Sequence, residues 1–175
     1  MSLVYQYKIA EMYQKTDDLD KTIEVYEKIL YDKGKETNFD IKAAMGTVRA
    51  YEKFAKEKAD DAKTPEYLFK AAEIQRSLKN YKKAIENYET IQTDFPDYEK
   101  TPHSTFLLGF IYENDLKDND KAKAMYEQFL EKYSEHELSD DVKFSLENLG
   151  ITPEEIIKRF EESNKAKDAN KKPER

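Results

Sequence analysis

Two histidines, His103 and His136, are the side chains of this chain best suited to move protons near neutral pH. His103 follows Pro102 just inside a predicted helix start, and His136 lies in the loop sequence Ser-Glu-His-Glu. Neither histidine shares a recognisable motif with a nucleophile. Both are therefore interpreted as surface histidines, and no catalytic residue is predicted.

The acidic residues do not form a recognisable metal or cofactor site. His136 is flanked by Glu135 and Glu137, but three adjacent residues cannot all face one ion. The chain has no cysteine, which excludes disulfides and thiolate metal sites. We expect a non-catalytic protein without a metal or cofactor. Three further acids resemble a calcium loop but lack its glycine and its final glutamate: Asp115, Asp118 and Asp120.

The composition of the 175 residues favours a thin, surface-rich protein. Charged residues make up 38% of the chain, above the ~25% of typical domains. The net charge of −7 disfavours a nucleic-acid partner, because phosphate backbones attract basic surfaces. No apolar run approaches the ~18 residues of a membrane span, so no membrane insertion is expected. The compartment is left open: periplasm or cell envelope if a leader was trimmed, cytoplasm otherwise.

The stretch from Thr64 to Tyr133 contains two copies of one pattern. Thr64-Pro65 returns 37 residues later as Thr101-Pro102. A repeat of this period predicts an array of helix hairpins. We assign a one-residue slip between the copies to the turn, where Asn-Asp-Leu-Lys-Asp-Asn-Asp is longer than Arg-Ser-Leu-Lys-Asn. Four positions of the second helix return after 38 residues: Ala84, Tyr88, Ile91 and Phe95 recur as Ala122, Tyr126, Phe129 and Tyr133.

A third copy covers residues 3–31, with apolar residues at the three- and four-residue spacing of amphipathic helices. Asp17 and Asp18 leave room only for a tight turn between its helices. Residues 39–58 read as a degenerate unit, either a hairpin or one long helix. Gly46 in this unit predicts a kink or a close helix contact, because a helical glycine costs about 1 kcal/mol relative to alanine.

Three Thr-Pro pairs predict helix starts, with a capping hydroxyl before a proline at the first helical position. Glu155 completes a capping box with the threonine of the last pair. Ile156, Ile157 and Phe160 of the last helix are expected to cover the end of the array. The pairs are Thr64-Pro65, Thr101-Pro102 and Thr152-Pro153.

These signals predict one helical repeat domain over residues 1–163. Residues 164–175 lack apolar periodicity, and we expect them to be a disordered tail. The predicted parts of the domain are repeat units at about 3–33, 39–60 (the degenerate one), 64–97 and 101–134, followed by C-terminal helices at 139–163.

The second helix of the Thr64 unit reads Tyr81-x-x-Ala84-Ile85-x-x-Tyr88, and Phe95-Pro96 follows it. This pattern resembles the tetratricopeptide repeat, a helix hairpin of about 34 residues. The resemblance implies an all-α fold, a right-handed superhelix of antiparallel helix hairpins. The family's first-helix tryptophan is absent here. Its small residues, where the two helices cross closely, are present: Ala10, Ala72 and Gly109 in first helices, and Thr22, Ala84 and Ala122 in second helices.

Within that family, residues 95–102 and 121–134 most resemble bacterial cell-envelope members. These members include the periplasmic domain of the Tol–Pal-associated coordinator and outer-membrane-assembly lipoproteins. The narrower resemblance implies a periplasmic protein that binds a peptide or another envelope protein.

In this family the first helices of successive repeats line a groove that binds the partner. The lysine and asparagine clamp with which some members hold a C-terminal carboxylate is absent here. An aromatic groove edged with acids suits a peptide with apolar and basic residues. Phe69 and Phe106 could instead pack between hairpins, whereas Phe110 is expected to be partly exposed. The groove residues that the resemblance implies are Tyr7, Glu11, Gln14, Phe69, Glu73, Arg76, Phe106, Phe110 and Glu113.

The sequence thus predicts a scaffold that binds a protein or peptide. Self-association is the alternative, because Leu3, Val4 and Tyr7 begin the array without an obvious polar cap. A hydrolase that uses one histidine is the third hypothesis.

Overall fold

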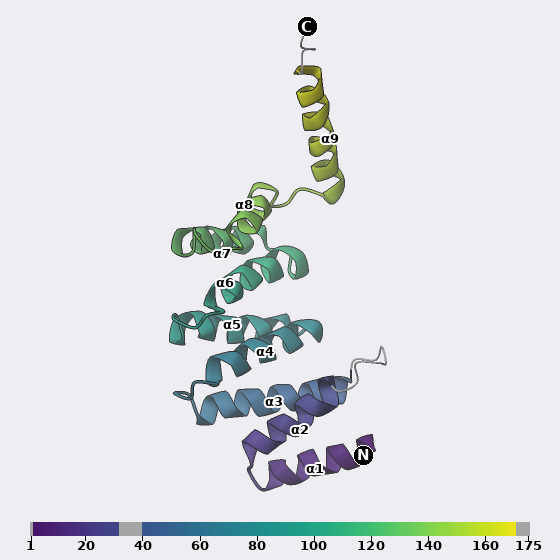
Figure 1. Cartoon of the computed structure of the whole chain (residues 1–175), viewed down its shortest axis with the longest axis vertical. Coiled ribbons are helices and arrows are strands. Elements are labelled where there is room, and N and C mark those ends of the chain that lie inside the picture. Colours follow the sequence, from purple (N-terminus) through teal and green to yellow (C-terminus); the bar gives the residue numbers. More distant parts are fainter. Residues whose placement is uncertain (1, 32–39, 171–175) are drawn as a thin grey trace. The chain divides into compact units, whose positions relative to one another are not determined.

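The structure, a computed structural model, describes residues 2–31 and 40–170. Every regular element in these two ranges is helical, which confirms the all-α class (Figure 1). Residues 1, 32–39 and 171–175, the last of which end the predicted tail, lie outside the described residues. The elements are α1 (Leu3–Lys15), α2 (Leu19–Tyr31), α3 (Ile41–Glu57), α4 (Thr64–Ser77), α5 (Tyr81–Asp94), α6 (Thr101–Phe110), the π-helix η1 (Ile111–Asp115), α7 (Asn119–Lys132), α8 (Ser139–Glu147) and α9 (Pro153–Asn170).

The chain divides into two compact units, Met1–Leu108 and Gly109–Arg175, with the border inside α6. In the first unit each helix packs against the next one along the chain, from α1 to α5. Its core is built from the apolar stripes of these helices. Ala10, Tyr26, Ile29 and Ala43 form one buried cluster, and a larger one includes Ile23, Val48, Tyr51, Phe54 and Ile74.

The degenerate unit is one continuous helix, α3, and this decides between the two alternatives. Asp40 caps it by accepting a hydrogen bond from the backbone N–H of Ala43 at 3.0 Å. Gly46 marks a close helix contact, as expected. A Cβ at Gly46 would lie only 2.4 Å from Cε1 of Tyr26 on α2, so glycine is what allows α2 and α3 to approach.

The second unit contains the same kind of close contact between a glycine and a tyrosine ring. Gly109, near the end of α6, faces the ring of Tyr126 on α7, and a Cβ there would lie 2.4 Å from Cε1 of that tyrosine. Tyr126, Phe129 and Val142 are fully buried. They form the apolar centre of the unit, in which α7 packs against η1 and α8.

The one-residue slip between the repeats lies in a helix and not in the turn, where the sequence had suggested it. Leu78 N–H donates to the carbonyl of Ile74, four residues earlier. The equivalent Leu116 N–H donates to the carbonyl of Ile111, five residues earlier, at 2.9 Å. The extra residue therefore widens the end of the first helix into the π-helix η1.

The three hairpin turns share one backbone feature. Asp17, Lys79 and Lys117 occupy equivalent turn positions, and each has a left-handed φ of 60°, 61° or 58° respectively. None of these residues is glycine, although glycine adopts this conformation at the lowest energetic cost.

The linkers after α3, α5 and α7 also share one hydrogen-bond pattern. In the linker after α5, the carbonyl of Phe95 accepts from the N–H of Tyr98 at 3.1 Å and from the hydroxyl of Thr101 at 2.8 Å. The N–H of Thr101 donates to the carbonyl of Tyr98 at 2.9 Å. The same three bonds recur in the other two linkers, among Lys58, Asp61 and Thr64 and among Tyr133, His136 and Ser139.

This pattern corrects the prediction that Thr64 and Thr101 are capping residues. Both are the first residues of their helices, and their hydroxyls bond backward to the carbonyl six residues earlier. That carbonyl belongs to the end of the preceding helix, where it has no intrahelical partner. The capping box at the last pair is confirmed, because Thr152 N–H donates to Glu155 at 3.1 Å and Glu155 N–H donates to the Thr152 hydroxyl at 3.3 Å.

The expectation that α9 covers the array with its apolar residues is wrong for two of them. Ile157 and Phe160 are 59% and 55% exposed. The ring of Phe160 stacks on Phe144 at 6.3 Å, but Phe144 is itself 46% exposed, so this pair lies at the surface. The helix continues to Asn170, seven residues beyond the predicted end of the domain. No helix in the described ranges has the length and apolarity needed to cross a membrane.

Candidate protein-binding site

The three predicted groove residues of α1 contact the next two helices. Tyr7 donates a hydrogen bond to Asp40 at 2.7 Å, and Lys42 lies 4.2 Å above its ring. Burial and the neighbouring Asp40 carboxylate raise the Tyr7 pKa. Exposed Glu11 pairs with Lys42 at 3.5 Å, and Gln14 accepts from the hydroxyl of Tyr26 at 3.2 Å.

Phe69 on α4 is a packing residue, the alternative that the sequence left open. It is 7% exposed and meets Tyr88 of α5 edge to face at 5.6 Å. Lys100 lies 5.2 Å from the centre of its ring. Arg76, seven residues further along α4, is half-buried.

Glu73 is exposed on α4 and makes no ion pair with a described residue. Desolvation raises the pKa of its carboxyl group, with a smaller contribution from Glu66, while Lys100 and Lys70 oppose the shift. Tyr31 of α2, 59% exposed, is within electrostatic reach of the same carboxylate.

A network of ion pairs runs beside Glu73, and sequence reasoning missed it. Lys70 pairs with Glu27 of α2 at 3.2 Å and lies 3.8 Å from Glu66. Glu66 also pairs with Lys100 at 2.9 Å and accepts a hydrogen bond from Tyr98. The four-residue spacing of Glu66 and Lys70 was the only sequence signal, because the other partners are distant in the chain.

The remaining predicted groove residues lie in α6 and η1. Phe106 and Phe110 are half-buried. Glu113 accepts a hydrogen bond from the hydroxyl of Tyr126 at 2.6 Å, so its carboxylate orients the central tyrosine of the second unit.

His136 has a local structural role that sequence reasoning did not find. Its Nδ1 accepts from the backbone N–H of Leu138 at 3.1 Å, and its ring meets Phe129 edge to face at 5.7 Å. The residue occupies the middle position of the linker pattern, where Asp61 and Tyr98 stand in the other two linkers. His103 is half-buried in α6.

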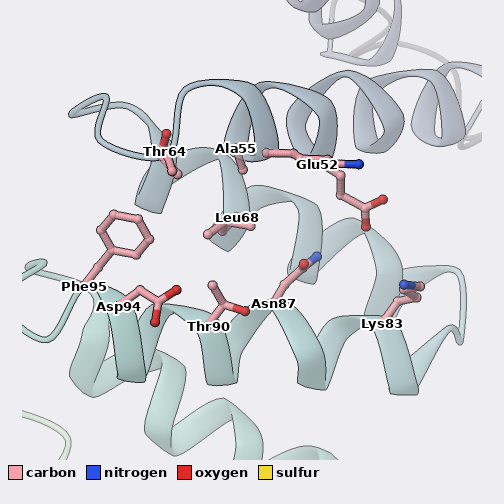
Figure 2. A pocket seen from close by; sticks show the side chains of 11 residues that line it. Glu52, Ala55, Thr64, Leu68, Lys83, Asn87, Thr90, Asp94 and Phe95 are labelled. Carbon is pink, nitrogen blue, oxygen red and sulfur yellow. The ribbon is translucent and has the colours of Figure 1, made fainter.

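A cavity of about 330 Å³ lies between α3, α4 and α5 in the first unit (Figure 2). None of the predicted groove residues lines it, and sequence reasoning gave no sign of it. Helices α3 and α5 form its two sides, while the first turns of α4 form its floor. The lining residues are Glu52, Ala55, Lys56, Ala59, Thr64, Leu68, Lys83, Asn87, Thr90, Asp94 and Phe95.

Comparison with known protein families gives three matches along the chain. The tetratricopeptide repeat profile matches residues 5–32, 66–98 and 104–136, which together make up more than half of the sequence. The chain belongs to the tetratricopeptide repeat family. A search of curated proteins found no match.

The matched segments of this tetratricopeptide repeat protein coincide with helix pairs. They cover α1 with α2, α4 with α5, and the stretch from α6 to α7, and they leave α3 as a single helix between the first two repeats. The fold class is therefore the α-solenoid type. Tetratricopeptide repeats are generally non-catalytic and indicate a protein-interaction scaffold with protein partners.

Proposed function

We propose that this tetratricopeptide repeat protein binds a protein or peptide segment with apolar and basic residues, along the face formed by the first helices of its repeats. The observation that carries the proposal is the environment of Glu73. This residue is exposed at the surface, yet its surroundings partly desolvate its carboxylate. A lysine or arginine from a partner would stabilise the charge that desolvation disfavours.

The two lysines that interact electrostatically with Glu73 each pair with another acid, so Glu73 is available to a cation from a partner. Lys70 is held by Glu27 at 3.2 Å and Lys100 by Glu66 at 2.9 Å. Tyr31 adds an exposed aromatic ring nearby, which suits an apolar side chain or a cation of the bound segment. The remaining proposed contact residues are Tyr7, Glu11, Gln14, Arg76 and Phe106 in the first compact unit, and Phe110 and Glu113 in the second. Phe69 is not among them, because it packs against Tyr88.

Selection of ligands from a random peptide library, followed by calorimetry, tests this proposal. Enriched peptides should combine lysine or arginine with apolar residues, and their affinity should fall with added salt. Charge reversal by Glu73→Arg should weaken binding tenfold or more. Glu89→Arg on α5, also exposed and outside the proposed face, is the matched control and should leave the affinity unchanged. Enrichment of acidic peptides, or equal binding to the Glu73→Arg variant, would refute the assignment.

Self-association is the second candidate, because the start of α1 exposes apolar side chains. Val4 and Tyr5 are 64% and 65% exposed. A second copy of the chain could bury them. Light scattering at high concentration distinguishes the cases: a monomeric mass eliminates the dimer, and a dimeric mass that reverts to monomer in a Val4→Ser/Tyr5→Ser variant supports it.

We also propose that the protein acts in a bacterial cell envelope. The similarity of residues 95–102 and 121–134 to envelope members of the family supports this proposal. Fractionation of cells that express the complete gene product is the test, and recovery from the cytoplasm alone would contradict it.

A further inference from the structure

The cavity between α3, α4 and α5 has the size of a ligand site. Its volume of about 330 Å³ lies within the range of small-molecule pockets. It is large enough for one apolar side chain of a partner with the adjacent backbone. None of the residues assigned above to the partner-binding face lines it, so it constitutes a separate site.

Asn87 of α5 is the unusual residue in this cavity. It is 8% exposed, and its Nδ2 has no hydrogen-bond partner among the described residues. Figure 2 shows its amide directed from α5 toward Leu68 and Glu52. Buried polar atoms are normally paired, so an unpaired donor in a cavity wall indicates that a partner is supplied from outside the fold.

The repeat itself shows that packing does not require asparagine at this position. Three other helices carry a tyrosine at the equivalent position, and in each of them the preceding residue is apolar: Val25 before Tyr26 on α2, Ala50 before Tyr51 on α3 and Met125 before Tyr126 on α7. On α5, where the position before Tyr88 lines the cavity, the residue is the polar Asn87. The replacement is costly to the fold unless the amide meets an acceptor.

The rest of the lining defines the chemistry of the ligand. Ala55, Leu68 and Phe95 provide apolar surface. The charged lining residues are two acids and two lysines, which favours an uncharged ligand: Glu52 and Asp94, Lys56 and Lys83. Two of these charges have internal partners, because Glu52 accepts from Gln75 at 3.2 Å and Lys83 pairs with Glu86 at 2.9 Å.

We propose that this cavity binds an uncharged apolar side chain of a partner protein, together with a carbonyl oxygen of the same segment that accepts a hydrogen bond from Asn87 Nδ2. This inference depends on the proposed function in one respect, namely that the ligand is a segment of a partner protein. The cavity lies outside the Glu73 face, and its test needs no protein partner.

The experiment is an NMR titration of the isotope-labelled full chain with N-acetyl-L-leucinamide, a neutral probe with an apolar side chain and two carbonyl groups. Saturable shifts are expected for the Asn87 side-chain amide and for residues of α3, α4 and α5. N-acetyl-L-leucine, an anion, and L-leucinamide, a cation, should each bind more weakly.

Two variants make the assignment specific. Asn87→Leu keeps the approximate volume but removes the donor, and it should weaken probe binding about tenfold, as expected for the loss of one hydrogen bond. Ala55→Leu keeps Asn87 but narrows the cavity from α3, and it should also weaken binding. Glu89→Gln, an exposed change on α5 outside the cavity, is the control and should bind like the parent chain.

Three outcomes would overturn the inference: no saturable shift at the solubility limit of the probe, shifts that avoid the Asn87 amide, or equal affinity in the Asn87→Leu variant. Each is independent of the peptide selection, which probes the Glu73 face. A failure there with a positive titration here would refute the proposed face and leave the cavity assignment intact.

Discussion

Replacing Gly46 with alanine tests the close contact between α2 and α3 in the first unit. In an isolated helix this change is favourable by about 1 kcal/mol, because alanine loses less backbone entropy than glycine. Here the new Cβ would lie 2.4 Å from Tyr26 Cε1 and 2.7 Å from Cδ1 and Cζ. Ordinary carbon contacts lie at about 3.5–4.0 Å, so the ring or the helix must move by about 1 Å.

The ring of Tyr26 has little freedom to move. It is 2% exposed, and its hydroxyl donates to Gln14 at 3.2 Å. Overpacking of a core typically costs about 1–3 kcal/mol. Subtracting the helix-propensity gain of about 1 kcal/mol leaves an expected net loss of about 1 kcal/mol in the free energy of unfolding.

A double-mutant cycle with Tyr26→Leu separates the two terms. Leucine removes the ring atoms that the new Cβ would meet, so Gly46→Ala in that background should raise stability by about 0.5–1 kcal/mol. The four proteins are compared by urea unfolding monitored by far-UV circular dichroism. A coupling free energy of about 2 kcal/mol is expected between the two sites.

The sign of the stability change in the Gly46→Ala single variant is decisive. If Gly46→Ala alone raises stability by about 1 kcal/mol, the close approach of α2 and α3 is absent and the reasoning is wrong. Met45→Ala, a change at the neighbouring, 46% exposed position, is the control and should shift stability by no more than about 0.5 kcal/mol.

Three further predictions concern a linker, an ion pair and a turn. Thr101→Val removes the hydroxyl that donates to the Phe95 carbonyl at 2.8 Å, and urea unfolding should show a loss of about 1–2 kcal/mol; an unchanged midpoint would contradict the linker pattern. Burial alone would raise the pKa of Glu66, but hydrogen bonds from Lys100 and Tyr98 outweigh it and hold the pKa below its usual value. Ionised Glu66 therefore stabilises the fold at any pH above the usual carboxyl pKa. This stabilisation is lost as the pH falls through the lower pKa that Glu66 has in the folded state. Glu66→Gln should accordingly cost less than about 1 kcal/mol at pH 7, because the pair is partly exposed, and the difference should shrink below about pH 4; a pH-independent difference would contradict this. Lys79→Gly relieves a left-handed φ of 61° and should raise the unfolding free energy by about 0.5 kcal/mol, whereas a loss would show that the turn is unstrained.

The sequence predicted what the repeat spacing encodes. Small residues at Ala10, Ala72 and Gly109 recur because two helices cross there, and these three positions are buried as expected. Gly46 was recognised for the same reason, since its cost in a helix requires a compensating contact. Such positions depend on neighbours that the repeat itself supplies, so the pattern is visible in one sequence.

The features that the sequence did not reveal depend on distant partners or on small backbone shifts. A threonine before a proline is the usual capping signal, yet Thr64 and Thr101 bond backward, because the preceding helix leaves a carbonyl within reach. The extra residue that forms the π-helix η1 was assigned to the turn, because an insertion in the helix and an insertion in the turn shift the repeat spacing equally. Asn87 reads as an ordinary helix residue until the cavity beside it is seen.

The linkers of this chain also bear on how such proteins change length. Each linker forms its three hydrogen bonds within seven consecutive residues, as from Lys58 to Thr64 and from Phe95 to Thr101. In each of the three described linkers, the donors and acceptors of these bonds all belong to the linker's own seven residues. A gene duplication that copies residues 64–100 in tandem would therefore join two hairpins through an intact linker. New repeats inserted at this boundary inherit their own connection, and selection then acts only on the packing between neighbouring hairpins.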